Sequence, residues 1–245
     1  MSTGQGVLIG LIDTGIDYTN PLFQNPDGTS RILRLWDQTM EREASPEPVA
    51  GFQPFYGTVY SQEDLSRALD SENPFELVPS TDTNGHGTFL AGVAAGRQIQ
   101  SPTTFSGAAP DAALAVVRLK PAKQYLREFF AVPADADAYQ ENDIMTAAAF
   151  LLGVAGQYRL PLVLLLGVGT AQGSHSGISP LAMQLQALSG TRGFACVTGA
   201  GNEAGFRHHY PGRLSPDQAY EDVELHVADR SEEHTSELQS QSTIS

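Results

Sequence analysis

Three polar residues stand at the ends of apolar or glycine-rich segments, and their types suit acyl transfer. Asp13 directly follows an apolar run, His86 lies between two glycines, and Asn202 follows a Gly-Ala-Gly turn. A neutral imidazole takes the proton of a serine hydroxyl at neutral pH, and a carboxylate fixes the imidazole tautomer. An amide group is a suitable donor to the oxyanion of a tetrahedral intermediate. The residue types therefore indicate an active site for acyl transfer.

The pattern of apolar residues predicts the elements that bring these three residues together. Near-continuous apolar runs, typical of strands buried in a parallel sheet, occupy residues 7–12, 113–119, 160–166 and 193–198. Helix-like stretches alternate with them, at residues 87–96, 143–156 and 179–188. This alternation predicts an α/β fold with a doubly wound, mostly parallel sheet and helices on both faces. Functional groups in such folds gather at the carboxyl ends of strands, so we expect Asp13, His86 and Asn202 on one rim.

Two segments interrupt the alternation and are interpreted as insertions. Residues 38–82 are rich in proline and acidic residues, and we expect a long loop there with a short helix over 63–69. Residues 120–142 form the second insertion. Both contain aromatic residues, which either line a substrate groove or anchor the insertions on the core. Of these two interpretations we favour anchoring.

The composition restricts the classes of partner. The 245 residues carry a formal net charge of −14, whereas nucleic acids and anionic membranes need a basic surface, so neither is an expected partner. No apolar stretch approaches the roughly 18 residues of a membrane span, and no signal peptide is visible, so the compartment stays open. The single cysteine, Cys196, excludes an intrachain disulfide.

No metal or cofactor site is predicted. The adjacent His208 and His209 project to opposite sides of an extended segment and lack a cysteine or a third ligand nearby. Asp17 and Asp82 have the character of turn and capping residues rather than of ligands. The acidic charge would allow a structural calcium ion, but no EF-hand-type loop supports one.

The C-terminal segment, residues 230–245, differs from everything before it. It has no apolar periodicity, and its first eleven residues match the translation of a short-read sequencing adapter, residue for residue. We interpret this segment as an artefact and expect it to be disordered. The interpretable domain is therefore residues 1–229, and we expect the natural protein to continue beyond it.

Three motifs in order resemble the subtilase family of serine peptidases. Residues 7–17 (VLIGLIDTGID) resemble its aspartate motif, residues 84–92 (NGHGTFLAG) its histidine motif, and residues 197–203 (VTGAGNE) its oxyanion-asparagine segment. The order Asp before His is that of the subtilisin triad. The resemblance extends from Gly4 to about Tyr210 and implies a subtilisin-like fold that hydrolyses protein or peptide substrates.

Further segments resemble one subgroup, the Csp-type subtilases of spore-forming clostridia. These segments are residues 31–38, 139–145 and 173–177. The subgroup resemblance implies a role in spore germination, with a cortex-lytic enzyme precursor as a candidate substrate. Some members of that subgroup are pseudoproteases that act in germinant signalling.

The family resemblance also implies roles for individual residues. Asp13 would orient His86, His86 would be the general base, and Asn202 would donate to the oxyanion. Substrate-binding roles would fall to Gly167, Val168 and Gly169, which would pair with the substrate backbone, and to Ala200 and Gly201 in the primary specificity pocket. The family often has serine where this chain has Gly167. A glycine has no side chain to contact the substrate, so the resemblance implies only backbone pairing at this position.

The nucleophilic serine of the family is absent from this chain. It lies in a Gly-Thr-Ser-x-Ala segment several dozen residues beyond the asparagine, and nothing after Asn202 matches. Ser30 follows Gly-Thr but sits in a polar turn, and Ser174 and Ser176 lie in a glycine-bounded loop, so all three are expected to be structural. The chain is thus interpreted as a C-terminally truncated serine endopeptidase that is itself inactive.

Three other classes of protein share parts of this sequence pattern. A regulatory pseudoprotease would keep the fold and bind a partner, and only the residue at the serine position distinguishes it. An aspartic peptidase needs two Asp-Thr-Gly motifs, whereas this one occurs once, at residues 13–15. A dinucleotide-binding loop at residues 167–173 has one residue too many before its third glycine.

Overall fold

The computed structural model describes most of the first 202 residues and a few beyond them. The described residues are 3–40, 49, 52, 54–99, 104–170, 173, 176–202, 210, 212, 215–218 and 220–224. The chain divides into two compact units, one made of Met1–Ala122 and Asp137–Asn202, the other of Lys123–Ala136 and Glu203–Ser245. The segment interpreted as an adapter lies outside the described residues, as do Ser174, His208 and His209.

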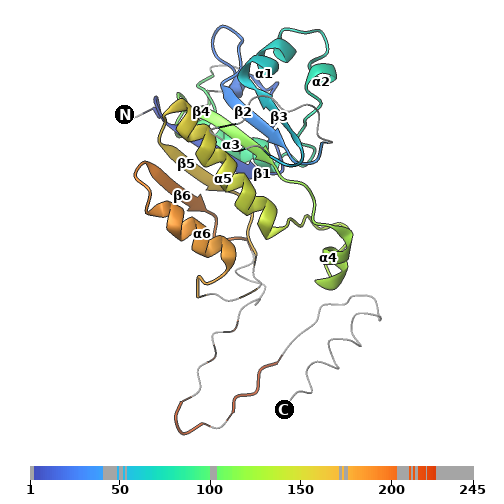
Figure 1. Cartoon of the computed structure of the whole chain (residues 1–245), viewed down its shortest axis with the longest axis vertical. Coiled ribbons are helices and arrows are strands. Elements are labelled where there is room, and N and C mark those ends of the chain that lie inside the picture. Colours follow the sequence, from blue (N-terminus) through green and yellow to red (C-terminus); the bar gives the residue numbers. More distant parts are fainter. Residues whose placement is uncertain are drawn as a thin grey trace. The chain divides into compact units, whose positions relative to one another are not determined.

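The first unit is built on a six-stranded sheet with the strand order β3-β2-β4-β1-β5-β6 (Figure 1). Its strands are β1 (Leu8–Asp13), β2 (Ile32–Asp37), β3 (Thr58–Ser61), β4 (Ala113–Arg118), β5 (Leu162–Leu166) and β6 (Phe194–Thr198). All neighbouring strands are parallel except β2 and β3, which are antiparallel. The predicted mostly parallel sheet is confirmed, and β1 occupies a central position in which all six residues are buried.

Helices cover both faces of this sheet, as predicted. Helices α5 (Glu141–Tyr158) and α6 (Pro180–Ser189) pack on the face that includes Leu8 and Ile12. Helices α1 (Gln62–Leu69) and α3 (His86–Ala95) pack on the opposite face, with Ile9 and Leu11. Figure 1 shows α5 lying across the near face and α3 behind the sheet. Because alternate residues of β1 point to opposite faces, one short apolar run contributes to both cores.

Part of the first insertion is regular structure, so the prediction of a long loop over 38–82 is wrong there. Besides the expected helix, α1, this stretch contains strand β3 and the short helix α2 (Pro74–Leu77). Strand β3 has only four residues, and its pairing with β2, including Trp36 opposite Val59, stabilises it. Such a short polar-flanked run has no periodicity that distinguishes it from a loop.

The aromatic residues of this first insertion anchor it, as predicted, with one exception. The ring of Trp36 lies 6.4 Å from that of Phe52 and 5.4 Å from that of Tyr56, measured between centroids. The indole N–H of Trp36 donates to the carbonyl of Tyr56 over 3.0 Å. Phe55, by contrast, is 85% exposed. Rings from the insertion and from the core thus form one apolar cluster.

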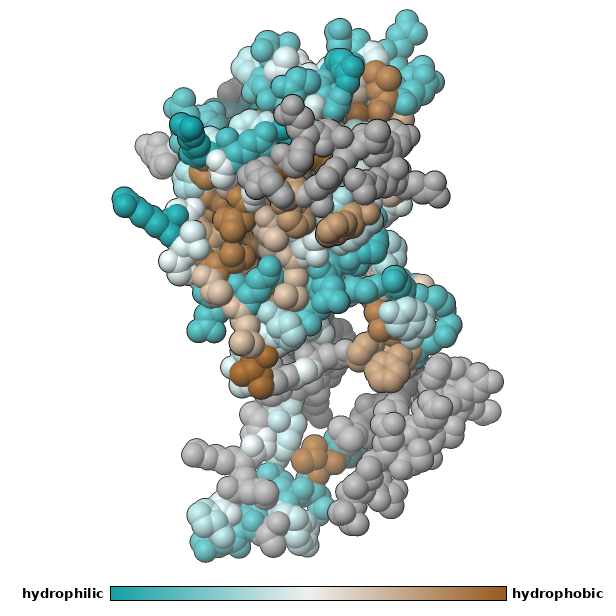
Figure 2. Space-filling view, in the orientation of Figure 1, coloured by the Kyte–Doolittle hydropathy of each residue, from teal (hydrophilic) through white to brown (hydrophobic). Residues whose placement is uncertain are grey.

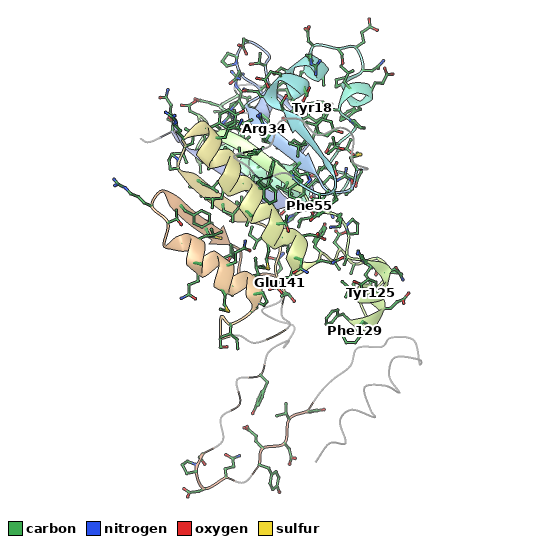
Figure 3. All side chains as sticks on the ribbon, viewed as in Figure 1. Tyr18, Arg34, Phe55, Tyr125, Phe129 and Glu141 are labelled. Atoms are coloured by element: carbon green, nitrogen blue, oxygen red, sulfur yellow. The ribbon has the colours of Figure 1, made fainter. Side chains whose placement is uncertain are left out.

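In the second unit, aromatic side chains lie at the surface of α4 (Gln124–Phe129) and directly after it. Tyr125, Phe129 and Phe130 are all exposed, and the first two project from α4 in Figure 3. The guanidinium of Arg127 closes the loop after α4 by donating to the carbonyls of Pro133, Ala134 and Ala136. Within this unit, backbone carbonyls and the Arg127 guanidinium hold the segment, and the anchoring of these three residues on the core stays a prediction.

A shallow apolar groove lies on the α5 face of the first unit. It runs between the C-terminal half of α5 and the start of β6, and Figure 2 shows hydrophobic residues gathered there. Leu152, Leu160 and Phe194 are among its lining residues.

Within the described part of the chain, no helix combines the length and the apolar character that a membrane span needs.

Candidate active site

The structure brings Asp13 and His86 together at the carboxyl end of β1. The Nδ1 of His86 lies 2.8 Å from the Oδ1 of Asp13, and the same oxygen accepts the backbone N–H of Thr14 over 2.7 Å. The Asp13 side chain is fully buried, whereas 45% of the His86 side chain is exposed. Because an ionised carboxylate only accepts hydrogen bonds, this contact places the proton on Nδ1 and leaves Nε2 as a proton acceptor.

A close approach of two backbones holds this pair. His86 is the first residue of α3, one residue before the predicted start of this helix, and the preceding Gly85 has a positive φ of 86°. A Cβ at the next residue, Gly87, would overlap the carbonyl oxygen of Gly15 and lie 3.2 Å from the Cβ of Asp13. Only glycine at position 87 lets α3 begin this close to the turn after β1.

Gly167 lies against the other side of the Asp13 carboxylate. It directly follows β5, and its N–H donates to the carbonyl of Ile12 over 3.4 Å. A Cβ at this position would overlap the Oδ2 of Asp13 and lie 2.5 Å from Leu90 Cδ1. That Oδ2 is buried and has no hydrogen-bond partner in the part of the chain that the structure describes. The serine that the family often has here would not fit beside Asp13 in its present position.

The other predicted site residues lie along the same edge of the sheet. Val168 and Gly169 continue from β5, and Ala200, Gly201 and Asn202 come shortly after β6, where all three are exposed. Because β6 is separated from β1 by β5, this last segment lies two strands away from Asp13. The structure thus brings His86 and Gly167 against Asp13 and leaves Asn202 further along the rim.

No serine completes a triad within the described residues. No hydroxyl in this part of the chain hydrogen-bonds the Nε2 of His86. The hydroxyl of Ser30 is buried and accepts the N–H of Ile32, so its predicted structural role is confirmed. The described ranges also contain no group of three or more His, Cys, Asp and Glu side chains that could hold a metal ion.

The sequence did not indicate Tyr139 as a site residue, although the charge of Asp13 acts on it. Burial and, to a smaller extent, the negative charges of Asp137, Asp13 and Asp82 together raise the pKa of Tyr139 to about 12. Residue 139 forms an isolated antiparallel bridge with Pro121, which closes the base of the second insertion. The signal available in the sequence was an aromatic residue just before a helix, which is too common to indicate a site.

The capping prediction for Asp17 and Asp82 is confirmed. The Asp17 carboxylate accepts the N–H and the hydroxyl of Thr19, which closes a turn. Asp82 accepts the N–H of Thr88 in the first turn of α3 over 2.9 Å. Thr14 also belongs to this site, because its hydroxyl accepts the N–H of Gly87 over 2.9 Å.

Comparisons with known proteins identify the family and the fold of this chain. The model of the subtilase family matches residues 4–223. The solved structure of the Clostridium perfringens CspB protease superposes with a TM-score of 0.66 at 30% identity, covering 82% of this chain and 38% of that one. The subtilisin-like protease SBT1.9 of Arabidopsis thaliana is 31% identical over 128 residues, and SBT2.2 of the same plant is 29% identical over 133.

These matches differ in how much of each relative they include. The two plant alignments cover 47% and 48% of this chain but 16% and 15% of the relatives, so the chain spans a small part of the curated proteins that it matches. The family model, by contrast, includes both strand ends that carry Asp13 and Gly167 and the start of the helix that carries His86. The match over most of the chain, together with the Asp13–His86 pair, establishes that this chain belongs to the subtilase family.

Proposed function

We propose that this chain supplies the general base and its orienting carboxylate to a serine endopeptidase. The observation that carries this proposal is the 2.8 Å contact between His86 Nδ1 and the fully buried Asp13. A buried carboxylate holds the imidazole in one tautomer and stabilises the imidazolium that forms during the reaction. The exposed part of His86 leaves its Nε2 accessible to a nucleophile and a substrate.

The nucleophile in this proposal is a serine outside the 245 residues. Its hydroxyl would give its proton to His86 Nε2 while its oxygen attacks the carbonyl carbon of the scissile peptide bond. His86 would then pass the proton to the leaving amine, and water would hydrolyse the acyl-enzyme by the same route. Asn202 would donate to the oxyanion, and residues 167–169 would pair with the substrate backbone.

The test compares the 245-residue chain with a longer protein translated from the uninterrupted gene. A fluorophosphonate probe should label the longer protein at one serine, and His86→Ala should abolish the labelling. The 245-residue chain should not be labelled at a comparable rate, because loss of the serine in subtilisin costs about 10⁶ in turnover. Efficient labelling of the short chain would refute the proposed position of the nucleophile.

The substrate is proposed from the subgroup that the sequence resembles. The 30% identity with the CspB protease over 82% of this chain supports the resemblance to Csp-type subtilases. From that resemblance we propose a peptidase of spore germination, with a cortex-lytic enzyme precursor as its substrate. The alternative is a pseudoprotease in germinant signalling. This alternative is compatible with the structure, because no serine among the described residues hydrogen-bonds the His86 side chain. A longer protein with alanine or glycine at the serine position, and no probe labelling, would favour that alternative.

A further inference from the structure

Asp82 makes more hydrogen bonds than a helix cap requires, and they reach both halves of the catalytic pair. Its Oδ2 accepts the N–H and the hydroxyl of Thr88, over 2.9 and 2.6 Å. Its Oδ1 accepts the N–H of Gly85 and the hydroxyl of Thr14, each over 2.9 Å. Thr88 and Gly85 flank His86, whereas Thr14 directly follows Asp13, 68 residues before Asp82.

The hydroxyl of Thr14 extends this connection to α3. While it donates to Asp82, it accepts the N–H of Gly87 over 2.9 Å. The hydroxyl of Thr88 similarly donates to Asp82 and accepts the N–H of Asp17 over 2.9 Å. Each threonine therefore links the turn after β1 to the start of α3, with the Asp82 carboxylate as the shared acceptor.

The charge state of Asp82 suits this arrangement. Burial raises its pKa, but the hydrogen bonds from Thr88, Gly85 and Thr14 outweigh burial, and the pKa lies below its usual value. The carboxylate is therefore ionised at neutral pH and can accept all four donors. It also lies at the N-terminus of α3, where the helix dipole favours a negative charge.

We propose that Asp82 is a positioning residue that fixes the separation of Asp13 and His86. Its role in catalysis rests on the proposed peptidase function, but its effect on the pair does not. Asp13 and His86 come from segments 73 residues apart, and one hydrogen bond between a buried and a half-exposed side chain would not by itself hold their backbones in register. The Asp82 carboxylate supplies that register, because it accepts the backbone N–H groups of Gly85 and Thr88 on either side of His86 and the side-chain hydroxyl of Thr14 next to Asp13.

The experiment observes the pair directly by NMR in the 245-residue chain. A proton held between His86 Nδ1 and Asp13 gives a strongly downfield signal, which is assigned by its loss in His86→Ala. Asp82→Asn presents a donor NH₂ group to hydrogen-bond donors, so we expect loss of the downfield signal. Thr14→Val keeps the charge of Asp82 but removes the link to Gly87, and we expect the same signal to weaken or disappear.

Asp27→Asn is the matched control. Asp27 also accepts the N–H and hydroxyl of a threonine, Thr29, but it does so in an exposed turn. Its substitution should leave the His86 signal unchanged. In the longer protein, we expect Asp82→Asn to lower kcat about 10²-fold with little change in KM, the effect of a misplaced catalytic group.

The outcomes separate this inference from the proposed function. A folded Asp82→Asn chain that keeps the downfield signal would overturn the role of Asp82 and leave the proposed function intact. If Asp82→Asn does not fold, Thr14→Val decides, and an unchanged signal there overturns the inference. Absence of the signal from the unsubstituted chain would contradict the Asp13–His86 pair itself, and with it both proposals.

Discussion

His86 Nδ1 and Asp13 Oδ1 lie 2.8 Å apart, with the carboxylate fully buried and 45% of the His86 side chain exposed. This difference in burial suits general-base catalysis. Water screens the buried Asp13 charge only weakly, so it stabilises an imidazolium at His86, while the exposed part of His86 can still be reached by a substrate. It also has a cost. The second carboxylate oxygen of Asp13 is buried without a partner among the described residues, which is unfavourable for folding. A buried polar group without a partner is often found at functional sites.

Gly87→Ala should destabilise the protein by about 1–3 kcal/mol, because the new Cβ would overlap the carbonyl oxygen of Gly15. Chemical denaturation of the purified chain measures this change. Gly156→Ala is the control, since residue 156 lies in α5 and a Cβ there has no atom within 4 Å. Removal of a helical glycine at such a site should raise the free energy of unfolding by about 0.5–1 kcal/mol. Equal effects of the two substitutions would contradict the close approach of α3 to the turn after β1.

Gly167→Ala should displace the Asp13 carboxylate, because the added Cβ would overlap Oδ2. We expect loss of the downfield His86 signal and a destabilisation of about 1–3 kcal/mol. Gly169→Ala is the matched control, because a Cβ there has no atom within 4 Å. A Gly167→Ala chain with normal stability and an intact signal would show that Asp13 can move without loss of its contact with His86.

The contribution of Asp82 to stability should depend on pH. Its pKa in the folded chain lies below its usual value of about 3.9, so its stabilising effect is present above that value and is lost as the pH falls through the folded pKa. The difference in unfolding free energy between the unsubstituted chain and Asp82→Asn should be constant near neutral pH. This difference should shrink in acid, where the protonated carboxyl of Asp82 can accept fewer hydrogen bonds. Urea denaturation at a series of pH values measures it, and a difference independent of pH would refute this prediction.

Tyr139 should report the charge of Asp13. The pKa of Tyr139 is raised to about 12 by burial, with a smaller contribution from the charges of Asp137, Asp13 and Asp82. Asp13→Asn removes one of these charges, so we expect the pKa of Tyr139 to fall. The ¹³Cζ shift of labelled tyrosine, followed against pH, measures it. Asp27→Asn should have no effect, and an unchanged Tyr139 pKa in Asp13→Asn would place this ring farther from the catalytic carboxylate.

The sequence predicted the elements whose apolar pattern is long enough to be distinctive. The runs that became β1, β4, β5 and β6 were identified within two residues of their observed ends. The location of Asp13 at a strand end and of His86 at a helix start followed from the same patterns. These features can be predicted from short stretches of sequence. A strand buried on both faces of a parallel sheet needs a continuous apolar run, and a helix start needs a turn that its residues allow.

The tertiary structure decided the contacts between segments far apart in sequence. The β2–β3 pairing, the overlap that excludes a side chain at Gly167 and the four hydrogen bonds of Asp82 all depend on where other segments lie. The sequence by itself determined which residues could form an Asp–His pair and at which element ends they stand. Only the fold decided that Thr14 and Thr88 would share one carboxylate, because a hydroxyl can donate to any acceptor that the surrounding backbone brings within reach.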